Sequence, residues 1–166
     1  MRETTSAMPE IDDAQSSDLI RTISRHTLSY VLYSISELFR HYDFDPIDLL
    51  IIHAILNANM LNIGKNPELD KRFGSMDRLE SGDVKQGVSR AALARFLSIP
   101  IETIRRRVDR LKKQAILSEA KDGLIVTEQN GFNFGDNQEL QKTNVVLVQK
   151  LLRDLKRAGI EGPDDL

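Results

Sequence analysis

The chain has 166 residues, a net charge of −2, 40% hydrophobic and 29% charged residues, which is typical of one globular domain with accessory helices. It contains no cysteine, which excludes disulfides, thiolate metal sites and thiol nucleophiles and suits a reducing cytoplasm. Aromatic residues make up only 5% of the chain, so we expect a core of leucine, isoleucine, valine and alanine.

The first segment, residues 1–17, is polar and acidic, and we predict a disordered tail without a signal peptide. No segment carries the roughly 18 uninterrupted apolar residues that a membrane span requires. We therefore expect a cytoplasmic protein that does not enter a membrane.

Residues 18–42 are predicted to form a long amphipathic helix, because apolar residues recur at spacings of three and four. The apolar stripe consists of Ile20, Ile23, Thr27, Val31, Ile35 and Leu38. This stripe either pairs with a second copy of the chain across a two-fold axis or packs within the monomer, and the first alternative predicts a dimerisation helix. Pro46 then favours the first turn of a second helix at 46–60.

Residues 61–87 are interpreted as a long, mobile connection, because they are charged and contain four glycines. Loops of this length in compact domains are commonly either mobile or functional. A short helix at 67–76 is expected within the connection.

The most informative stretch begins at Ser89, which is a good N-cap residue. A short helix at 90–97, a corner at 98–100 and a helix at 101–114 are predicted in succession. The buried stripe of the helix at 101–114 comprises Ile104, Val108 and Leu111.

A β-hairpin is predicted after this pair of helices. Two short apolar runs, 116–120 and 124–127, flank a Lys121-Asp122-Gly123 turn, and an Asp-Gly turn in this setting is a strong hairpin pattern. Two helices at a tight corner followed by a hairpin are the parts of a winged helix-turn-helix. The predicted fold class is therefore mainly α with a small β-hairpin wing, and the winged helix-turn-helix domain spans 43–131.

A last helix is predicted over 136–159. Asp136 and Glu139 fit a variant of the capping box at its start, and Gly159 is a natural stop. Its apolar stripe is too wide for one neighbour and comprises Leu140, Leu147, Val148, Leu151, Leu152 and Leu155. We therefore predict a second dimerisation helix, so that two long helices flank the winged domain.

The basic residues are concentrated in one stretch. Residues 89–115 contain eight basic and two acidic residues, a local charge of +6, so the rest of the chain carries −8. A basic island on an acidic body is the pattern of a protein that binds a polyanion such as double-stranded DNA. The alternative is a solvated, salt-bridged helix face, and composition does not decide between the two.

The helix at 101–114 is the predicted recognition helix, because exposed side chains of such a helix reach base edges in the major groove. The residues expected to contact bases lie in its first half and are Glu102, Thr103, Arg105 and Arg106. The other DNA-binding candidates are Ser89 and, for phosphates, Arg90, Arg107, Arg110 and the wing's Lys121. We expect Arg105, Arg106 and Arg110 to stand clear of carboxylates in the same molecule.

From about Val88 to Gly131 the chain resembles the MarR family of transcription regulators. Residues 103–117 resemble that family's recognition helix and first wing strand, Leu93-Ala94 the preceding helix, and Val126-Thr127-Glu128 the end of the wing. The DNA-binding half of the Lrp/AsnC regulators is a second resemblance, but too little chain follows for their ligand-binding domain. The MarR resemblance implies a homodimer joined by its terminal helices, a pseudo-palindromic operator and a small-molecule effector that releases DNA.

Three features depart from the MarR pattern. Ala115 stands where a glycine is usual, which predicts a differently shaped turn. The wing is short and lacks the family's Asp-x-Arg, so minor-groove contact by the wing does not carry over. The connection at 61–87 is longer than the family's.

The sequence thus predicts a sequence-specific transcription regulator that binds DNA as a homodimer. The alternative function is a winged-helix protein-interaction or assembly module, whose arginines would meet an acidic protein surface. An enzyme is not expected, because the chain has no P-loop, dinucleotide-binding glycine motif or His-Glu-x-x-His pattern, and no cofactor or metal is predicted. His53 lies in an apolar helix and is expected to be a hydrogen-bonded core residue.

Overall fold

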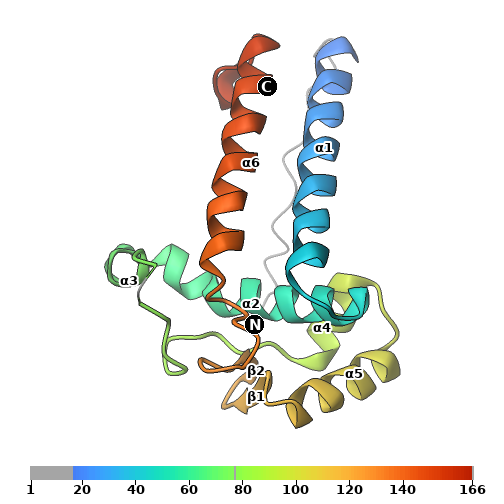
Figure 1. The fold of residues 1–166 in the computed structure, drawn as a ribbon, viewed down its shortest axis with the longest axis vertical. Helices are drawn as coiled ribbons and strands as arrows, with labels where there is room; N and C mark the ends of the chain where they lie inside the picture. The colour runs from blue at the N-terminus through green and yellow to red at the C-terminus, as the bar shows by residue number, and fades with distance from the viewer. Residues whose placement is uncertain (1–16, 77, 166) are drawn as a thin grey trace, which may run out of the picture. The chain divides into compact units, whose positions relative to one another are not determined.

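The computed structural model describes residues 17–76 and 78–165. These residues are mainly helical with one antiparallel two-stranded hairpin, as the predicted fold class requires (Figure 1). The chain divides into two compact units, one formed by the described residues up to 36 and from 143 onward, the other by residues 37–142. Except for Ser17, which begins the first helix, the predicted disordered tail lies outside the described residues.

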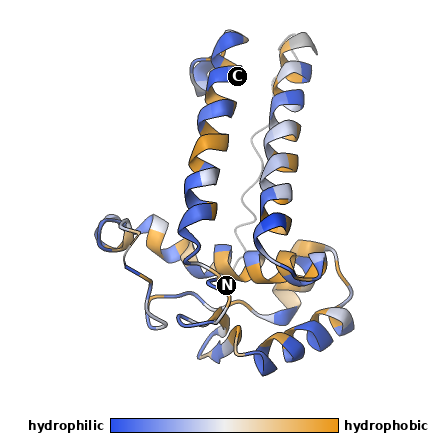
Figure 2. Cartoon of the chain, in the orientation of Figure 1, coloured by the Kyte–Doolittle hydropathy of each residue, from blue (hydrophilic) through white to orange (hydrophobic). Residues whose placement is uncertain are grey.

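The core of the 37–142 unit is built on α2, Pro46–Lys65, which Figure 2 shows as largely hydrophobic. Asp45 caps α2 by accepting a hydrogen bond from the Ile47 N–H at 2.9 Å, and Pro46 fits the first turn. The expected aliphatic core is confirmed and includes Leu49, Ile51, Ile52, Ile55, Leu93, Ile104, Val108, Leu111, Ile116, Leu124 and Val126. Two aromatic residues, Tyr42 and Phe134, complete it.

By length and composition alone, α2 is the one described helix that is long and apolar enough to cross a membrane. Leu49, Ile51, Ile52 and Ile55 are buried in the core of this unit. Core helices of globular domains pass the same test, so these properties of α2 are weak support for a membrane span.

The connection after α2 is shorter than predicted. The helix α2 continues to Lys65 and includes Gly64, which is exposed. Asn66 ends α2 and caps α3, Pro67–Phe73, by accepting two backbone hydrogen bonds from the first turn of α3. The predicted short helix is therefore confirmed, and the start of the predicted connection at 61–87 is wrong.

The last part of this connection is held against the hairpin by Asn59, which is completely buried. Its side-chain nitrogen donates to the Gln86 and Leu124 carbonyls at 2.7 and 3.3 Å, and its oxygen accepts from the Val126 N–H at 3.0 Å. Val88 pairs with Leu124 as an isolated bridge. Residues 86–88 thus have hydrogen-bond partners on Asn59 and the hairpin, and the mobility expected for the connection at 61–87 stays a prediction.

Two helices, α4 (Arg90–Leu97) and α5 (Ile101–Lys113), meet at a tight corner as predicted. Ser89 is the N-cap of α4 and accepts a hydrogen bond from the Ala92 N–H at 3.1 Å. Ser98 ends α4 with a left-handed φ of 54°. This left-handed residue turns the chain sharply between the two helices.

The turn after α5 also has a left-handed residue. Ala115 has a φ of 58°, and its N–H donates to the Lys112 carbonyl at 3.0 Å. The Ile116 N–H donates to the Leu111 carbonyl at 3.1 Å, which completes a Schellman motif. Ala115 therefore adopts the conformation that usually selects glycine, and the expectation of a differently shaped turn is wrong.

The predicted hairpin is confirmed, with β1 (Leu117–Ala120) antiparallel to β2 (Gly123–Val126). The two central turn residues are Lys121-Asp122, and Gly123 is the first residue of β2. A Cβ at Gly123 would lie 2.7 Å from the Val88 backbone, so glycine permits the close approach of that segment.

The last helix, α6 (Gln138–Arg157), begins later than predicted. Asn137 is its cap, since its side-chain oxygen accepts from the Leu140 N–H at 2.9 Å. Asp136 lies in the preceding turn, where its N–H donates to the Asn133 carbonyl at 3.0 Å. The predicted capping box beginning at Asp136 is therefore wrong, because the turn extends one residue further along the chain.

The second unit combines most of α1, Ser17–His41, with the part of α6 beyond residue 142. The Tyr30 hydroxyl donates to Asn144 Oδ1 at 3.1 Å. A small cavity between these parts of α1 and α6 is lined by His26, Ser29, Tyr30, Tyr33, Leu147, Lys150, Leu151 and Asp154. One face of α1 therefore packs within the chain. The helix α6 ends at Arg157, two residues before the predicted stop at Gly159, which lies in the following turn with a φ of 86°.

Other apolar side chains of this unit are exposed to solvent. The aliphatic ones that are more than half exposed are Leu28, Leu32, Val145, Val146 and Leu152. Leu28 and Leu32 do not belong to the predicted stripe of the first helix. Two residues of that stripe, Ile20 and Val31, are themselves 39% and 46% exposed, whereas the α1 residues that line the cavity against α6 lie outside the stripe. The helix α1 therefore carries apolar side chains that its contact with α6 does not cover.

Candidate nucleic-acid interface

The helix α5 has one buried face and one exposed, strongly charged face. Ile104, Val108 and Leu111 are completely buried, as their spacing predicts. The exposed residues are Glu102, Arg105, Arg106, Asp109, Arg110 and Lys113, and Figure 2 shows α5 as hydrophilic over much of its surface. The buried stripe therefore fixes which side chains of α5 face solvent.

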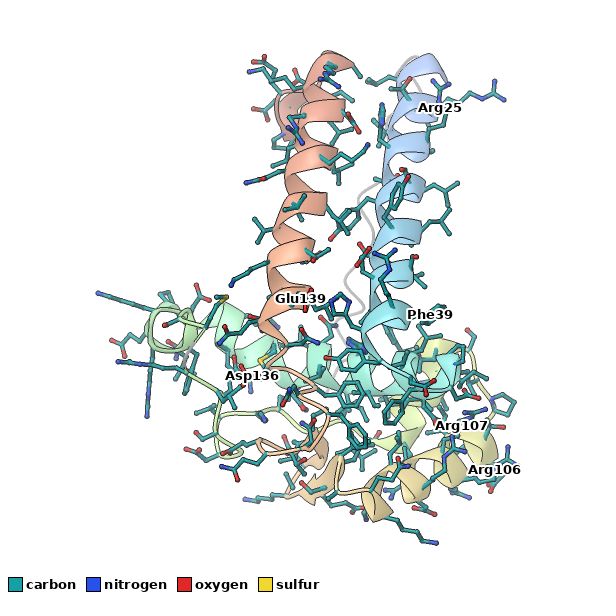
Figure 3. All side chains as sticks on the ribbon, viewed as in Figure 1. Arg25, Phe39, Arg106, Arg107, Asp136 and Glu139 are labelled. Carbon is teal, nitrogen blue, oxygen red and sulfur yellow. The ribbon has the colours of Figure 1, made fainter. Side chains whose placement is uncertain are left out.

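Arg107 is held inside the protein by two carboxylates from the start of α2. Its Nη1 donates to Asp45 Oδ1 at 2.7 Å and to Asp48 Oδ1 at 2.8 Å. The hydrogen bond to Asp48 is the largest cause that raises the pKa of Arg107 above its usual value. The Arg107 side chain is only 15% exposed, so it joins α5 to α2 and is poorly placed to meet a phosphate (Figure 3).

Arg110 shares the same buried carboxylate. Its Nη2 donates to Asp48 Oδ2, while the Asp48 side chain is 4% exposed and the Arg110 side chain is 53% exposed. Arg110 is therefore ion-paired and at the same time open to solvent. The expectation that Arg110 stands clear of carboxylates is wrong, because α2 brings an acidic residue beneath it.

Arg90 takes part in a second ionic cluster, which links α4, α5 and β1. Glu119 accepts from Lys112 Nζ at 2.9 Å and from Arg90 Nη2 at 2.7 Å. Hydrogen bonds from Lys112 and Arg90 lower the pKa of Glu119 to about 2. Arg90 also lies 3.6 Å from Asp109, so this predicted phosphate contact is engaged by two carboxylates.

Arg105 is paired along the surface of α5. Its Nη1 donates to Glu102 Oε1 at 2.6 Å, and the two side chains are 59% and 75% exposed. The expectation that Arg105 stands clear is also wrong. Exposed pairs of this kind contribute about 0.2–1 kcal/mol, so either partner can exchange its ion pair for another ligand at small cost.

Arg106 is the α5 arginine that has no hydrogen bond or ion pair within the described part of the chain, and it is exposed (Figure 3). It lines a surface hollow of about 460 Å³ with Arg107 and Arg110. Three guanidinium groups thus border one hollow, and the charges of two of them, Arg107 and Arg110, are balanced by Asp45 and Asp48. Arg106 supplies its uncompensated positive charge.

The remaining predicted residues lie around this surface. Thr103 is half-buried near the start of α5, and Lys121 is exposed in the hairpin turn. The Ser89 hydroxyl is already occupied as the cap of α4. The structure therefore brings Arg106, Arg107 and Arg110 together and leaves Arg90 in the separate cluster around Glu119.

Sequence reasoning missed the carboxylates that neutralise this surface. Asp45 and Asp48 have the positions of ordinary acidic residues at a helix start, where the helix dipole favours them. Nothing in the local pattern connects them with residues about 60 positions later in the chain. Glu119 is likewise an alternating strand residue, and the ion pairs that it forms depend on how β1 packs beside α4 and α5.

Histidine and acidic side chains elsewhere in the described part of the chain are residue types that can serve a core role or hold a metal ion. His53 Nδ1 lies 2.8 Å from the Leu49 carbonyl, and burial lowers its pKa, so the predicted hydrogen-bonded core role is confirmed. Among residues 17–76 and 78–165, no group of three or more histidine, aspartate or glutamate side chains is arranged to hold a metal ion.

Three comparisons with known proteins found no match to this chain, whether among protein-family models, curated protein sequences or solved structures. The resemblance to MarR regulators stays a prediction from the residues quoted above.

Proposed function

We propose that this protein is a winged helix-turn-helix transcription regulator of the MarR-like kind, with α5 as its recognition helix. The observation that carries the proposal is the exposed basic face of α5, which stands on a completely buried stripe and follows a tight corner from α4. The hairpin directly after α5 has the position of a wing. A helix presented in this way has the dimensions to enter a major groove.

The ion pairs divide the predicted DNA contacts into two groups. Arg106 is unpaired within the described residues and is our first candidate for bidentate hydrogen bonding to guanine. Glu102, Thr103 and Arg105 lie beside it near the start of α5 and supply further base contacts. Arg110, Lys113 and Lys121 are exposed and suit phosphates.

Arg107 and Arg90 have a supporting role in this proposal. Arg107 is mostly buried against Asp45 and Asp48, and Arg90 joins α4 to Glu119. Arg107 links the recognition helix to the start of α2, and Arg90 lies 3.6 Å from Asp109 on the recognition helix, so each supports its position relative to a neighbouring element. Their loss would disturb the orientation of α5 and so weaken binding indirectly.

We also propose that the protein acts as a homodimer through its long helices. The exposed apolar side chains Leu28, Leu32, Val145, Val146 and Leu152 belong to one unit. Exposed apolar side chains on long helices commonly mark an interface, and a second copy of the chain is the commonest partner of such a surface. Two copies would present two α5 helices to an inverted repeat.

Selection from a random duplex pool, read by sequencing, tests this proposal. We expect enrichment of an inverted repeat and a steep loss of affinity with rising salt, because cations of α5 and the hairpin displace counterions from phosphates. Replacing Arg106 with Ala should relax the preference at one base position in each half-site, at a cost of about 1–3 kcal/mol. A pool without consensus, together with affinity that does not change with salt, would contradict the proposed function.

A protein-interaction or assembly module is the second candidate, and the ion pairs favour it. Arg90, Arg105, Arg107 and Arg110 are already paired with carboxylates of this chain, so the free positive charge is smaller than the sequence indicates. A surface of paired charges also suits contact with a protein. Capture of acidic peptides, with no binding to any duplex in the pool, would favour this function.

A further inference from the structure

Asp48 holds two arginines of α5 that differ sharply in exposure. Arg107 is 15% exposed and has Asp45 as a second carboxylate partner, at 2.7 Å. Arg110 is 53% exposed and has Asp48 as its ion-pair partner. The two pairs therefore respond differently to a competing anion in solution.

We propose that Arg110 exchanges Asp48 for a DNA phosphate when the protein binds a duplex, while Arg107 stays with Asp48. This inference rests on the proposed function, because it concerns how the α5 surface receives DNA. Asp48 would thus be a positioning residue: it holds Arg110 at the rim of the hollow formed with Arg106 and Arg107 until a phosphate replaces it.

The burial of Asp48 explains why Arg110 can leave. A buried carboxylate without a partner is costly, since neither water nor another cation compensates its charge. Arg107 still pairs with Asp48 at 2.8 Å after Arg110 has left, so the carboxylate is never unpaired. Release of Arg107 would instead leave both Asp45 and Asp48 without this guanidinium, in a place that a phosphate cannot easily reach.

The exchange restrains binding to unrelated DNA. Each phosphate contact by Arg110 requires the loss of an existing ion pair, so that contact adds less affinity than an unpaired arginine would add. The restraint acts on phosphate contacts, which carry no sequence information, and leaves Arg106 free for base edges. Asp48 thereby lowers the affinity for any duplex, because it weakens a phosphate contact. It leaves the preference for one sequence, which depends on Arg106, nearly unchanged.

Binding of a duplex of random sequence, measured across a salt series, tests the exchange. We expect R110A to reduce the slope of log affinity against log salt by about 0.9, the value for one phosphate contact. Lys71 on α3 is an exposed cation without an ion pair within the described residues, so K71A is a matched control that should leave the slope unchanged. D48N should raise affinity for the duplex roughly two- to fivefold at low salt, since Arg110 then gives up no ion pair.

The outcomes separate the exchange from the proposed function. A wild-type protein that binds the duplex with a salt-dependent affinity, while R110A has the same slope, overturns the exchange alone. A wild-type protein without salt-dependent duplex binding overturns the proposed function and the exchange together. Circular dichroism confirms that each variant is folded, and if D48N is not, the surface variant R110A decides the question.

Discussion

The side chain of Asn59 joins three segments that are far apart in the sequence. It lies on α2, and its amide contacts the Gln86 carbonyl, the Leu124 carbonyl and the Val126 N–H. The Asn59 side chain that makes these hydrogen bonds is completely buried. Buried polar groups of this kind stabilise a fold chiefly because their backbone partners have no other ligand.

Replacing Asn59 with Ala should lower the free energy of unfolding by about 3 kcal/mol, because Gln86 O and Val126 N–H lose their partners inside the core. Denaturant unfolding followed by circular dichroism measures this change. Asn57→Ala is the control, since Asn57 is exposed on the same helix and should change the stability by less than about 0.5 kcal/mol. Similar losses for the two variants would contradict the role of Asn59.

The carboxylate of Glu119 should give the protein a stability component that depends on pH. Its folded-state pKa of about 2 lies below the ordinary value of 4.5, so this component is fully present above about pH 4.5 and is lost as pH falls toward 2. Glu119→Gln should therefore reduce the unfolding midpoint at pH 7, and the difference from wild type should shrink as pH falls below 4.5. Glu68→Gln, at an exposed glutamate of α3, is the control and should show no such convergence. An unchanged difference at pH 7 and pH 3 would count against the Glu119 cluster.

Three helices of this chain end in the same way. Ser98 after α4, Ala115 after α5 and Gly159 after α6 all have a left-handed φ, between 54° and 86°. In each case the next residue donates a hydrogen bond five residues back into the helix, which is the Schellman pattern. Glycine has no Cβ and adopts this conformation without strain, whereas serine and alanine do so at a cost of about 1 kcal/mol.

Replacing Ala115 with Gly should therefore stabilise the protein by up to about 0.6 kcal/mol, because the greater entropy of glycine in the unfolded chain offsets about 0.4–1 kcal/mol of the relieved strain. Thermal or denaturant unfolding measures the shift. Ala120→Gly in β1 is the matched control, because Ala120 has no positive φ, and it should destabilise the protein. If A115G and A120G destabilise to the same extent, the turn after α5 is not under the strain inferred here.

Local patterns predicted the elements well where the deciding information lies within a few residues. Ser89 and the periodic apolar residues of α5 determine their helices through contacts with near neighbours. The start of α6 was missed by a small margin because Asp136 and Asn137 are both good caps, and only the preceding turn selects between them. Gly64 was counted among the four glycines of the predicted connection, but α2 extends past it to Lys65 and ends at the cap residue Asn66.

The candidate site was harder to predict, because its charges are balanced across elements. The positions of the α5 arginines followed from helical periodicity alone. Asp48, the partner of Arg107 and Arg110, lies on α2, and Glu119, the partner of Lys112, lies on β1. Only tertiary packing brings these two carboxylates to α5. The sequence therefore overstated the free positive charge of this surface and understated the support that fixes the helix.

The two long helices of the molecule, α1 and α6, carry apolar side chains that are exposed to water. Leu32 is 58% exposed and Leu152 is 60% exposed, although they belong to a unit with little core of its own. Water contact at these side chains is unfavourable by about 25 cal/mol for each Å² that a partner would cover. Association of two copies of the chain would remove this exposure.

Leu32→Glu should convert the proposed dimer to a monomer, because a carboxylate buried in an apolar interface has no compensating partner. Sedimentation equilibrium over a range of concentrations measures the change. Leu61→Glu alters a leucine that is 44% exposed on α2, in the other unit, and should leave the dimer intact.

We further expect L32E to bind a single half-site while losing its preference for the inverted repeat, since only a dimer presents two α5 helices at a fixed spacing. A wild-type protein that sediments as a monomer, or L32E that remains a dimer, would show that the exposed faces of α1 and α6 do not join two copies.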